Sequence, residues 1–172
     1  MKSSQNSAET FLQKLRDKPV AICGIGHNNL PVIRQFLRHG ARITACDKRT
    51  REQLGETADR LEKDGVTLSL GERYLDGVQD AQLILRTPGM KPYLPEFDAA
   101  RRQGVTVTSE MELFFSLCPA PIYGVTGSDG KTTTTTIMAG LLETTGKTIH
   151  LGGNIGRPLL PEIESVSPED IA

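Results

Sequence analysis

The stretch VAICGIGHNN, residues 20–29, runs from a short apolar segment directly into a glycine-rich turn. Apolar residues that follow one another without polar alternation are typical of a strand buried on both faces of a parallel sheet. Similar segments recur at 43–47, 83–87 and 122–126, with stretches of helical character between them. Buried strands that alternate with helices predict an α/β fold, in which right-handed βαβ units build a parallel sheet.

A recurring glycine marks where the helices end. Basic or polar residues lead into Gly40, Gly65, Gly104 and Gly146, and a β-branched segment follows each of them. Glycine just past a helix end adopts the left-handed conformation at low cost, and cations in the last turn interact favourably with the helix dipole. Each glycine therefore predicts the end of one helix and the start of the next strand.

The two ends of the chain differ from this regular pattern. Residues 1–18 are expected to carry a short amphipathic helix with Phe11, Leu12 and Leu15 on one side. Near Cys118–Pro121, two prolines interrupt the alternation before a new strand-like segment begins. We therefore expect one domain over residues 1–118 and the beginning of a second domain over residues 119–172.

Composition excludes several classes of partner. Lys and Arg total 20 and Asp and Glu total 21, so a net charge of −1 gives no general attraction to nucleic acid or an anionic membrane. No apolar run reaches the length of a signal peptide core or a membrane span, which indicates a cytoplasmic protein. The three cysteines are too widely separated for a metal-ligand pattern, and Cys23 and Cys46 are expected to be small buried thiols.

The first glycine-rich loop, GIGHNN (24–29), follows a strand and precedes a helix. Gly24 and Gly26 let the backbone turn tightly and approach a pyrophosphate at the helix N-terminus. Asp47 ends the next strand 23 positions after Gly24, near the place where a dinucleotide fold carries its ribose-binding carboxylate. Asn29 stands where that fold has its third glycine. The loop predicts a site for a nucleotide diphosphate, and a plain glycine-rich turn with a solvated Asp47 is the alternative.

The second loop, VTGSDGKTTTTT (125–136), has the order that a phosphate-binding loop needs. Its glycine-rich turn can present backbone N–H groups to phosphates, Lys131 supplies a charge for the β- and γ-phosphates, and the Thr132 hydroxyl can reach Mg²⁺. Val125 departs from the strict motif, which has glycine at this position. The residues predicted to bind ATP are Gly127, Ser128, Asp129, Gly130, Lys131, Thr132 and Thr133.

Taken together, three stretches resemble the Mur ligase family. TGSDGKTT (126–133) looks like the ATP loop of these enzymes, and GGNIGRPLL (152–160) looks like their substrate loop. The GIG turn and the later Asp-Lys-Arg (47–49) are similar to the Rossmann-like front domain of the members that add D-glutamate. The resemblance covers about residues 20–160. It implies a Rossmann-like domain that holds a UDP-linked sugar, followed by the start of a P-loop α/β ATP-binding domain.

The resemblance also implies roles for individual residues. The residues expected to line the uridine and diphosphate pocket are Gly24, Ile25, Gly26, His27 and Asn28, with Asp47, Lys48 and Arg49 on its nucleoside side. Thr87, Pro88 and Gly89 match a Ser-Pro-Gly turn that meets the substrate, and Asn154 is expected at the muramoyl-alanine end. Lys131 is the expected catalytic residue, with Thr132 as a Mg²⁺ ligand.

The activity implied is ATP-driven amide formation between UDP-N-acetylmuramoyl-L-alanine and D-glutamate, through an acyl phosphate. The resemblance implies further machinery beyond Ala172, so we expect these residues alone to bind but not to catalyse. Three alternatives stay open: a ligase that adds L-alanine to UDP-N-acetylmuramate, a nicotinamide-dependent oxidoreductase, and a non-catalytic nucleotide-binding module. The sequence gives no indication of oligomeric state.

Overall fold

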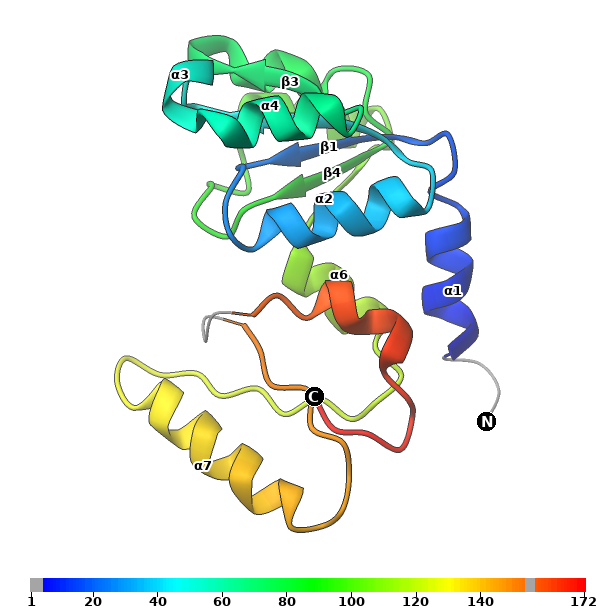
Figure 1. Cartoon of the computed structure of the whole chain (residues 1–172), viewed down its shortest axis with the longest axis vertical. Helices are drawn as coiled ribbons and strands as arrows, with labels where there is room; N and C mark the ends of the chain where they lie inside the picture. The colour runs from blue at the N-terminus through cyan, green and yellow to red at the C-terminus, as the bar shows by residue number, and fades with distance from the viewer. Residues whose placement is uncertain (1–4, 154–156) are drawn as a thin grey trace. The chain divides into compact units, whose positions relative to one another are not determined.

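The computed structural model describes residues 5–153 and 157–172, and Figure 1 labels its main helices and strands. These residues form two compact units. We call Phe11–Glu110 the sheet unit, and Met1–Thr10 together with Met111–Ala172 the P-loop unit. The expected domain boundary between residues 118 and 119 stays a prediction.

The sheet unit is built on one parallel sheet of five strands. Their order across the sheet is β3-β2-β1-β4-β5, and every neighbouring pair is parallel. The predicted α/β fold with a parallel, Rossmann-like sheet is therefore confirmed. The strands are β1 (Pro19–Cys23), β2 (Arg42–Asp47), β3 (Thr67–Leu70), β4 (Leu83–Arg86) and β5 (Thr106–Ser109).

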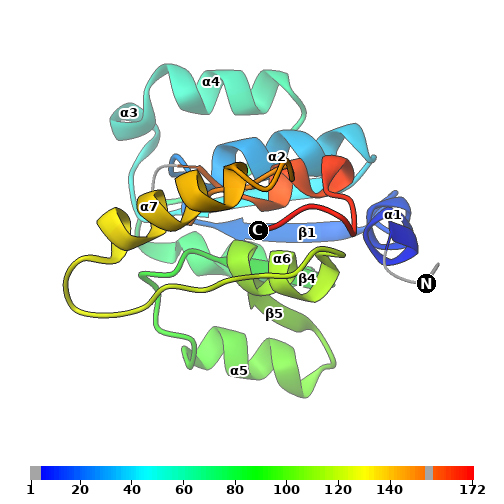
Figure 2. The ribbon, with the colours of Figure 1, turned by 90° about the horizontal axis from the view of Figure 1, so that it is seen from below.

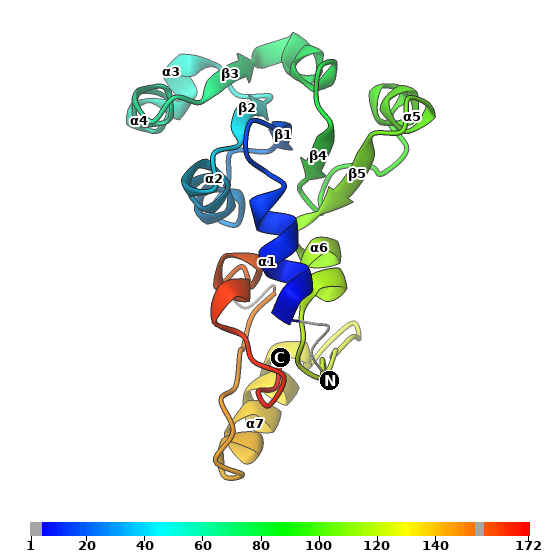
Figure 3. The ribbon, with the colours of Figure 1, turned by 90° about the vertical axis from the view of Figure 1, so that its right-hand side faces the viewer.

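Helices cover both faces of this sheet, as a parallel sheet requires. Figures 2 and 3 show α2 and α4 on one face and α5 on the other. Gly40, Gly65 and Gly104 follow helix ends with φ values of 79°, 87° and 82°, so the predicted left-handed glycines are confirmed. The helices of the unit are α2 (Asn29–Arg38), α3 (Arg51–Leu54), α4 (Glu56–Lys63), the 3₁₀ helix η1 (Gly71–Val78) and α5 (Pro95–Arg102).

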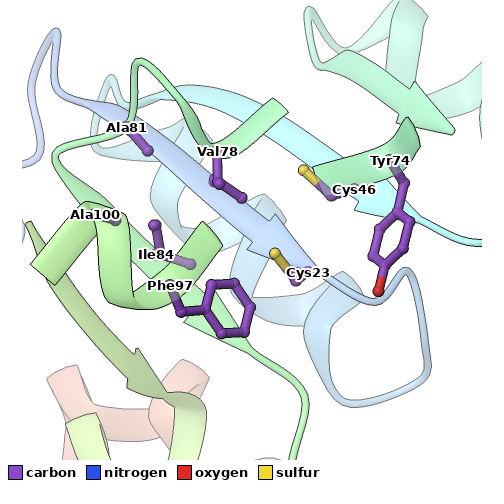
Figure 4. Packing of buried hydrophobic residues seen from close by; sticks show 9 residues of the cluster. Cys23, Cys46, Tyr74, Val78, Ala81, Ile84, Phe97 and Ala100 are labelled. Carbon is purple, nitrogen blue, oxygen red and sulfur yellow. The ribbon is translucent and has the colours of Figure 1, made fainter. Parts of the chain in front are cut away.

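The buried cluster under η1 and α5 explains the two cysteines of the sheet (Figure 4). Cys23 and Cys46 are register partners on β1 and β2, and both are fully buried. A hydrogen bond with the Cys46 thiol, reinforced by burial, raises the pKa of Cys23 far above its usual range. The prediction of small buried thiols is therefore confirmed.

The amino-terminal helix α1 spans Gln5–Gln13, within the predicted range. Leu12 and Leu15 are buried as expected, although Leu15 lies in the turn after the helix rather than in it. The Phe11 ring packs against Phe36 of α2, with 6.1 Å between the ring centroids.

The P-loop unit holds most of α6 (Glu110–Leu117), all of α7 (Lys131–Glu143) and the 3₁₀ helix η2 (Leu160–Ser165). The expected strand at 122–126 does not form, which corrects the sequence prediction. Tyr123 N–H donates to Ala172 O and Ala172 N–H donates to Pro121 O, at 2.8 and 3.0 Å. Two backbone hydrogen bonds to one short neighbouring segment are too few to form a β-ladder. Near residue 149, a single bridge pairs Ile149 with Ile171.

Candidate functional site

The two loops predicted to meet the substrate lie at the topological switch point of the sheet. From β1 the chain moves outward to β2 and β3 and then returns to β4 on the other side of β1. In open α/β sheets, ligands bind in the crevice that this reversal leaves beyond the carboxyl ends of the strands. The loop 24–28 follows β1 and the turn 87–89 follows β4, so both border this crevice.

Gly24 is needed where these two loops touch. Its φ of 97° lies in the left-handed region, which favours glycine. A Cβ at this position would lie 3.1 Å from Thr87 Cγ2 and 3.2 Å from Thr87 Cβ. The backbone of the first loop therefore approaches the side chain of the second as closely as a glycine allows. The Thr87 N–H donates to Cys23 O at 3.0 Å and fixes the start of the turn.

A clasp of Asp47 and Arg49 holds the first loop from the β2 side. Asp47 Oδ2 accepts from the Ile25 N–H at 2.7 Å and from Arg49 Nη2 at 2.9 Å. Asp47 Oδ1 accepts from the backbone N–H of Arg49 at 2.9 Å and from its Nε at 3.0 Å. Arg49 Nη2 also donates to Ile25 O at 2.5 Å. Both backbone polar groups of Ile25 are thus tied to the end of β2.

The electrostatics of the clasp favour an ionised Asp47. Burial of this carboxylate acts to raise its pKa, because the charged form loses solvation. The hydrogen bonds and positive charge of Arg49, with the Ile25 N–H, outweigh that effect and hold the pKa of Asp47 below its usual range. The carboxylate is therefore a fixed negative charge at neutral pH.

Asn29, which departs from the glycine pattern, holds the same loop from the helix side. Its Nδ2 donates to Gly24 O at 2.8 Å and to Cys23 O at 3.2 Å, and the side chain is buried. The Asn29 side chain therefore holds the turn in place through hydrogen bonds. A glycine at this position would only let the helix pack closely on the sheet. In the sequence, Asn29 is only a departure from the glycine fingerprint, and its role becomes visible in its two hydrogen bonds to loop carbonyls.

The tip of the first loop is what remains available to a ligand. Gly26 and His27 are exposed and Asn28 is half-buried, whereas the Ile25 side chain is only 2% exposed. Within the part of the chain that the structure describes, the N–H groups of Gly26 and Asn28 donate to no protein acceptor. These two donors at the start of α2 suit an anion. The predicted role of Ile25 in the pocket is limited to its backbone, which the clasp already occupies.

The remaining predicted substrate residues of the sheet unit lie around this tip. Pro88 and Gly89 are exposed in the turn after β4. Lys48 is exposed and its ammonium lies 6.0 Å from the centre of the Tyr74 ring, a cation–π contact. The structure thus brings the predicted residues of strands β1, β2 and β4 to one edge of the sheet. Asn154, predicted at the far end of the substrate, lies outside the described residues.

In the P-loop unit, the glycine-rich turn is open to solvent and leads into α7. Gly130, with φ of 73°, caps the helix, and Gly127 has φ of 153°. Lys131 Nζ folds back onto the turn and donates to Gly127 O at 2.5 Å and to Ser128 O at 3.0 Å. Among the residues described, the N–H groups of Ser128, Asp129 and Gly130 have no protein acceptor. The turn therefore presents several donors that fit the oxygen atoms of a phosphate chain.

The threonine run divides into two parts. Thr135 and Thr136 donate their hydroxyls to the carbonyls of Lys131 and Thr132, one turn earlier, at 2.8 and 2.9 Å. Thr132 and Thr133 are exposed at the first turn of the helix. A single hydroxyl ligand suits Mg²⁺, because this ion keeps several bound waters and takes few protein ligands when it also binds substrate phosphates. The predicted ATP loop thus presents the Thr132 hydroxyl and the Lys131 ammonium close together at the start of α7.

A cavity of about 260 Å³ lies beside this loop and belongs wholly to the P-loop unit. Lys131, Thr132 and Thr135 of α7 form one part of its wall, and Gly152 and Gly153 form another. Aromatic side chains, including those of Phe114 and Tyr123, make the rest of the lining largely apolar. The segment predicted as a substrate loop therefore shares a cavity with the start of the predicted ATP loop.

A buried histidine braces the segment around this cavity. His150 Nε2 lies 3.0 Å from Asp170 Oδ2, and its Nδ1 lies 3.5 Å from Glu162 Oε2. Glu162 also pairs with Arg157, whose carbonyl accepts from the Gly153 N–H at 3.1 Å. These contacts give His150 a structural role. The contacts of His150 join residues on both sides of the segment 152–160 to Asp170, near Ala172.

We expect both units to lose stability in acid through these carboxylates. The Ser167 N–H, followed by His150, lowers the pKa of Asp170, and the pKa of Asp47 is also lowered. A group with a depressed folded-state pKa stabilises the fold above its unfolded value, about 4, and loses that contribution as pH falls through the folded value. Denaturant unfolding from pH 6 to pH 2.5 should show a steeper acid loss in wild type than in the D47N/D170N variant. Equal slopes for the two proteins would contradict this expectation.

Two further observations concern residues 5–153 and 157–172 only. Over these ranges, the helices lack the combination of length and apolar character that a membrane crossing needs. The same ranges contain no group of three or more His, Cys, Asp or Glu side chains placed to hold a metal ion.

Two known protein families match this chain, one within the sheet unit and one within the P-loop unit. A family described as "Mur ligase MurD-like, N-terminal domain" matches residues 18–109, and one described as "Mur ligase middle domain" matches residues 125–171. The first match ends where β5 ends, and the second begins just before the glycine-rich turn of the ATP loop. Residues 110–124 lie between the two matches.

Two curated relatives, both from bacteria, agree with this assignment. The chain is 46% identical over 162 residues to UDP-N-acetylmuramoylalanine–D-glutamate ligase of Clostridium kluyveri, covering 94% of this chain and 35% of that protein. It is 48% identical over 160 residues to the ligase of the same name from Acetivibrio thermocellus, covering 93% and 34%. A solved murein peptide ligase from Psychrobacter arcticus shares 20% identity with a TM-score of 0.48, over 90% of this chain and 36% of that one. The chain thus spans about a third of the curated relatives it matches, and it belongs to the Mur ligase family, with a MurD-like N-terminal domain.

Proposed function

We propose that this chain supplies the UDP-substrate domain and the first part of the ATP-binding domain of a ligase that joins D-glutamate to UDP-N-acetylmuramoyl-L-alanine. The reaction is ADP-forming and uses Mg²⁺, and its place is the cytoplasmic synthesis of peptidoglycan precursors. The observation that carries the proposal is the pairing of two separate anion cradles in one chain. One lies at the β1–β4 switch point and the other at the start of α7.

The first cradle suits the diphosphate of a UDP-sugar. Gly26 and Asn28 offer backbone N–H groups at the start of α2, where the helix dipole favours negative charge. The turn Thr87-Pro88-Gly89, in which Pro88 and Gly89 are exposed, borders the same crevice and can meet the sugar. The clasp and Asn29 hold the loop in this shape without a ligand, so little ordering remains to be done on binding.

The second cradle suits the phosphates of ATP. In the ligase reaction, the alanyl carboxylate attacks the γ-phosphorus and ADP leaves, which gives an acyl phosphate. The D-glutamate amine then attacks the activated carbonyl, and phosphate leaves through a tetrahedral intermediate. Lys131 would move from its contacts with the loop carbonyls to the phosphate oxygens, where negative charge must be neutralised during transfer. Thr132 would hold Mg²⁺ through its hydroxyl, and the ion when bound would supply positive charge to the phosphates.

The alternatives explain fewer of the observations. A nicotinamide-dependent oxidoreductase would need a carboxylate free to accept from the ribose, and Asp47 is already fully hydrogen-bonded. A non-catalytic nucleotide-binding module would explain the ATP loop and leave the switch-point cradle without a ligand. The ligase that adds L-alanine to UDP-N-acetylmuramate shares both cradles and is the second candidate.

Calorimetric titration of the purified chain distinguishes these candidates. The ligands are UDP-N-acetylmuramoyl-L-alanine, UDP-N-acetylmuramate and NAD, each added to the same preparation. Tighter binding of the alanyl compound is the expected result. Preference for UDP-N-acetylmuramate would favour the L-alanine ligase, and binding of NAD alone would overturn the proposal.

A further inference from the structure

We propose that the sheet unit carries a second anion-binding surface, at the amino ends of β1 and β2, which docks a short acidic segment of a partner protein. The surface consists of residues 14–18, which lead into β1, and residues 34–42, which form the second half of α2 and the start of β2. We call it the basic edge. All of it belongs to the sheet unit, and its role is independent of the proposed ligase function.

The charge of the basic edge is opposite in sign to that of the rest of the chain. The basic edge holds six of the 20 Lys and Arg residues and, in Asp17, one of the 21 acidic residues. The remaining residues include 14 basic and 20 acidic ones, so a charge of +5 here stands against −6 elsewhere. An anion is therefore attracted locally, although the whole chain has a net charge of −1. The six cations are Lys14, Arg16, Lys18, Arg34, Arg38 and Arg42.

Within the part of the chain that the structure describes, none of these six cations pairs with a carboxylate. The Nε of Arg42 donates to a backbone carbonyl, that of Asp17, at 3.1 Å. Five of the six side chains are exposed, and Lys18 is half-buried. Their positive charge is thus left for a group outside the fold. Five arginines elsewhere each pair with a carboxylate: Arg49, Arg51, Arg73, Arg101 and Arg157.

Backbone hydrogen bonds hold the two segments of the basic edge against each other. The Asp17 N–H donates to Gly40 O at 2.8 Å, and the Arg42 N–H donates to Lys18 O at 2.9 Å. A Cβ on Gly40 would lie 3.6 Å from Arg16 Cα, so the segments are in contact there. Figures 1 and 2 show the end of α2 beside the turn that leads into β1. The backbone that carries the cations is therefore fixed before a partner arrives, which reduces the ordering cost of binding.

A groove of about 480 Å³ lies at the junction of the two segments. Arg16 lines it from one segment and Arg38 from the other, and guanidinium groups pair with carboxylates through two parallel hydrogen bonds. Arg34 lies one helical turn before Arg38 and is also exposed, so it extends the row of charge beyond the groove. An acidic side chain in the groove would lie between two arginines. The groove is lined by Gln13, Arg16, Leu37, Arg38, His39 and Gly40.

A short acidic segment suits the basic edge better than a lipid bilayer or a nucleic acid does. Among the described residues, the exposed large apolar side chains lie outside it, so the basic edge offers no anchor for a bilayer. A nucleic acid is a long polyanion, and the charge of −6 on the remaining residues would repel the parts that extend beyond the basic edge. A few carboxylates on one peptide match the basic edge without reaching that acidic remainder.

The test titrates octaglutamate into wild type and the R16E/R38E variant at low ionic strength. Wild type should bind the peptide, and the variant should bind it at least about tenfold more weakly, because two attractive contacts become repulsive. Added salt should weaken binding to wild type, since exposed charges are screened. In amide NMR spectra of wild type, the largest shifts should fall within residues 14–18 and 34–42.

Two control variants separate the basic edge from charge in general. R73E/K91E makes the same change in net charge at exposed cations outside the basic edge, and its octaglutamate affinity should match wild type within about twofold. R16K/R38K keeps the charge but removes the planar guanidinium groups, so it should bind more weakly than wild type. The UDP affinity of R16E/R38E should equal that of wild type, because the cradle lies at the other end of β1. If R16E/R38E does not fold, R16A/R38A takes its place.

Equal octaglutamate affinity in wild type and R16E/R38E would overturn the proposal, as would shifts confined to other residues. Full affinity in R16K/R38K would remove the arginine groove from it. Vesicles of phosphatidylglycerol and a single-stranded oligonucleotide are titrated beside the peptide. If either binds the same residues more tightly than octaglutamate does, the partner is of a different class and the proposal is wrong.

Discussion

Replacing Gly24 with valine is expected to abolish detectable UDP binding and to lower the free energy of unfolding. The backbone at Gly24 has a φ of 97°, which costs a residue with a side chain about 1–3 kcal/mol in strain. The new Cβ would also lie 3.1 Å from Thr87 Cγ2, so the two loops that border the crevice must move apart. Denaturant unfolding measures the first effect and calorimetric titration with UDP measures the second.

Gly26 provides the matched control for stability. A Cβ at Gly26 would meet no atom within 4 Å, and its backbone lies outside the left-handed region. The G26A variant should therefore unfold within about 0.5 kcal/mol of wild type, as is usual for exposed substitutions. Wild-type stability in the G24V variant, or strong destabilisation in G26A, would show that the contact between the loops is not as described.

Replacing Lys131 with alanine is expected to weaken ATP binding about 10- to 100-fold, the loss typical of a hydrogen bond to a charged group. In the absence of nucleotide, the Lys131 ammonium contacts only Gly127 O and Ser128 O in the part of the chain described, and that turn is exposed. The substitution should therefore change ATP affinity with little change in stability. Titration with ATP and Mg²⁺ gives the affinity, and thermal unfolding gives the stability.

Lys147 is the control for this substitution. It is an exposed lysine of the same unit, beyond the end of α7. The K147A variant removes the same charge without touching the glycine-rich turn, so its ATP affinity should match that of wild type. Equal ATP affinity in wild type and K131A would remove Lys131 from the proposed ATP site.

The positions of the loops could be predicted because they depend on local chemistry. Glycine spacing and the order strand–turn–helix put Gly24 at the end of β1 and Gly130 at the start of α7. Asp47 was predicted at the end of a strand and lies there. These features need only the backbone preferences of glycine and the pattern of apolar residues, and both are visible in the sequence.

The partners of those residues could not be predicted, because they depend on distant contacts. Nothing local shows that Asp47 is saturated by Arg49 and Ile25, since Ile25 is 22 positions away. Asn29 looked like a departure from the glycine fingerprint, and only its two bonds to carbonyls of the loop reveal its role. The expected strand at 122–126 was wrong for a related reason. Its apolar residues suit a strand, but a strand also needs a partner of sufficient length.

Amide NMR with UDP tests the proposed cradle at the switch point most directly. If the account is correct, the largest shifts on adding UDP occur at Gly26, His27 and Asn28 and in the turn 87–89. The amides of Ser128, Asp129 and Gly130 should then respond to ATP rather than to UDP. Saturation with UDP that leaves residues 26–28 unshifted, or that shifts the ATP loop instead, would contradict the account.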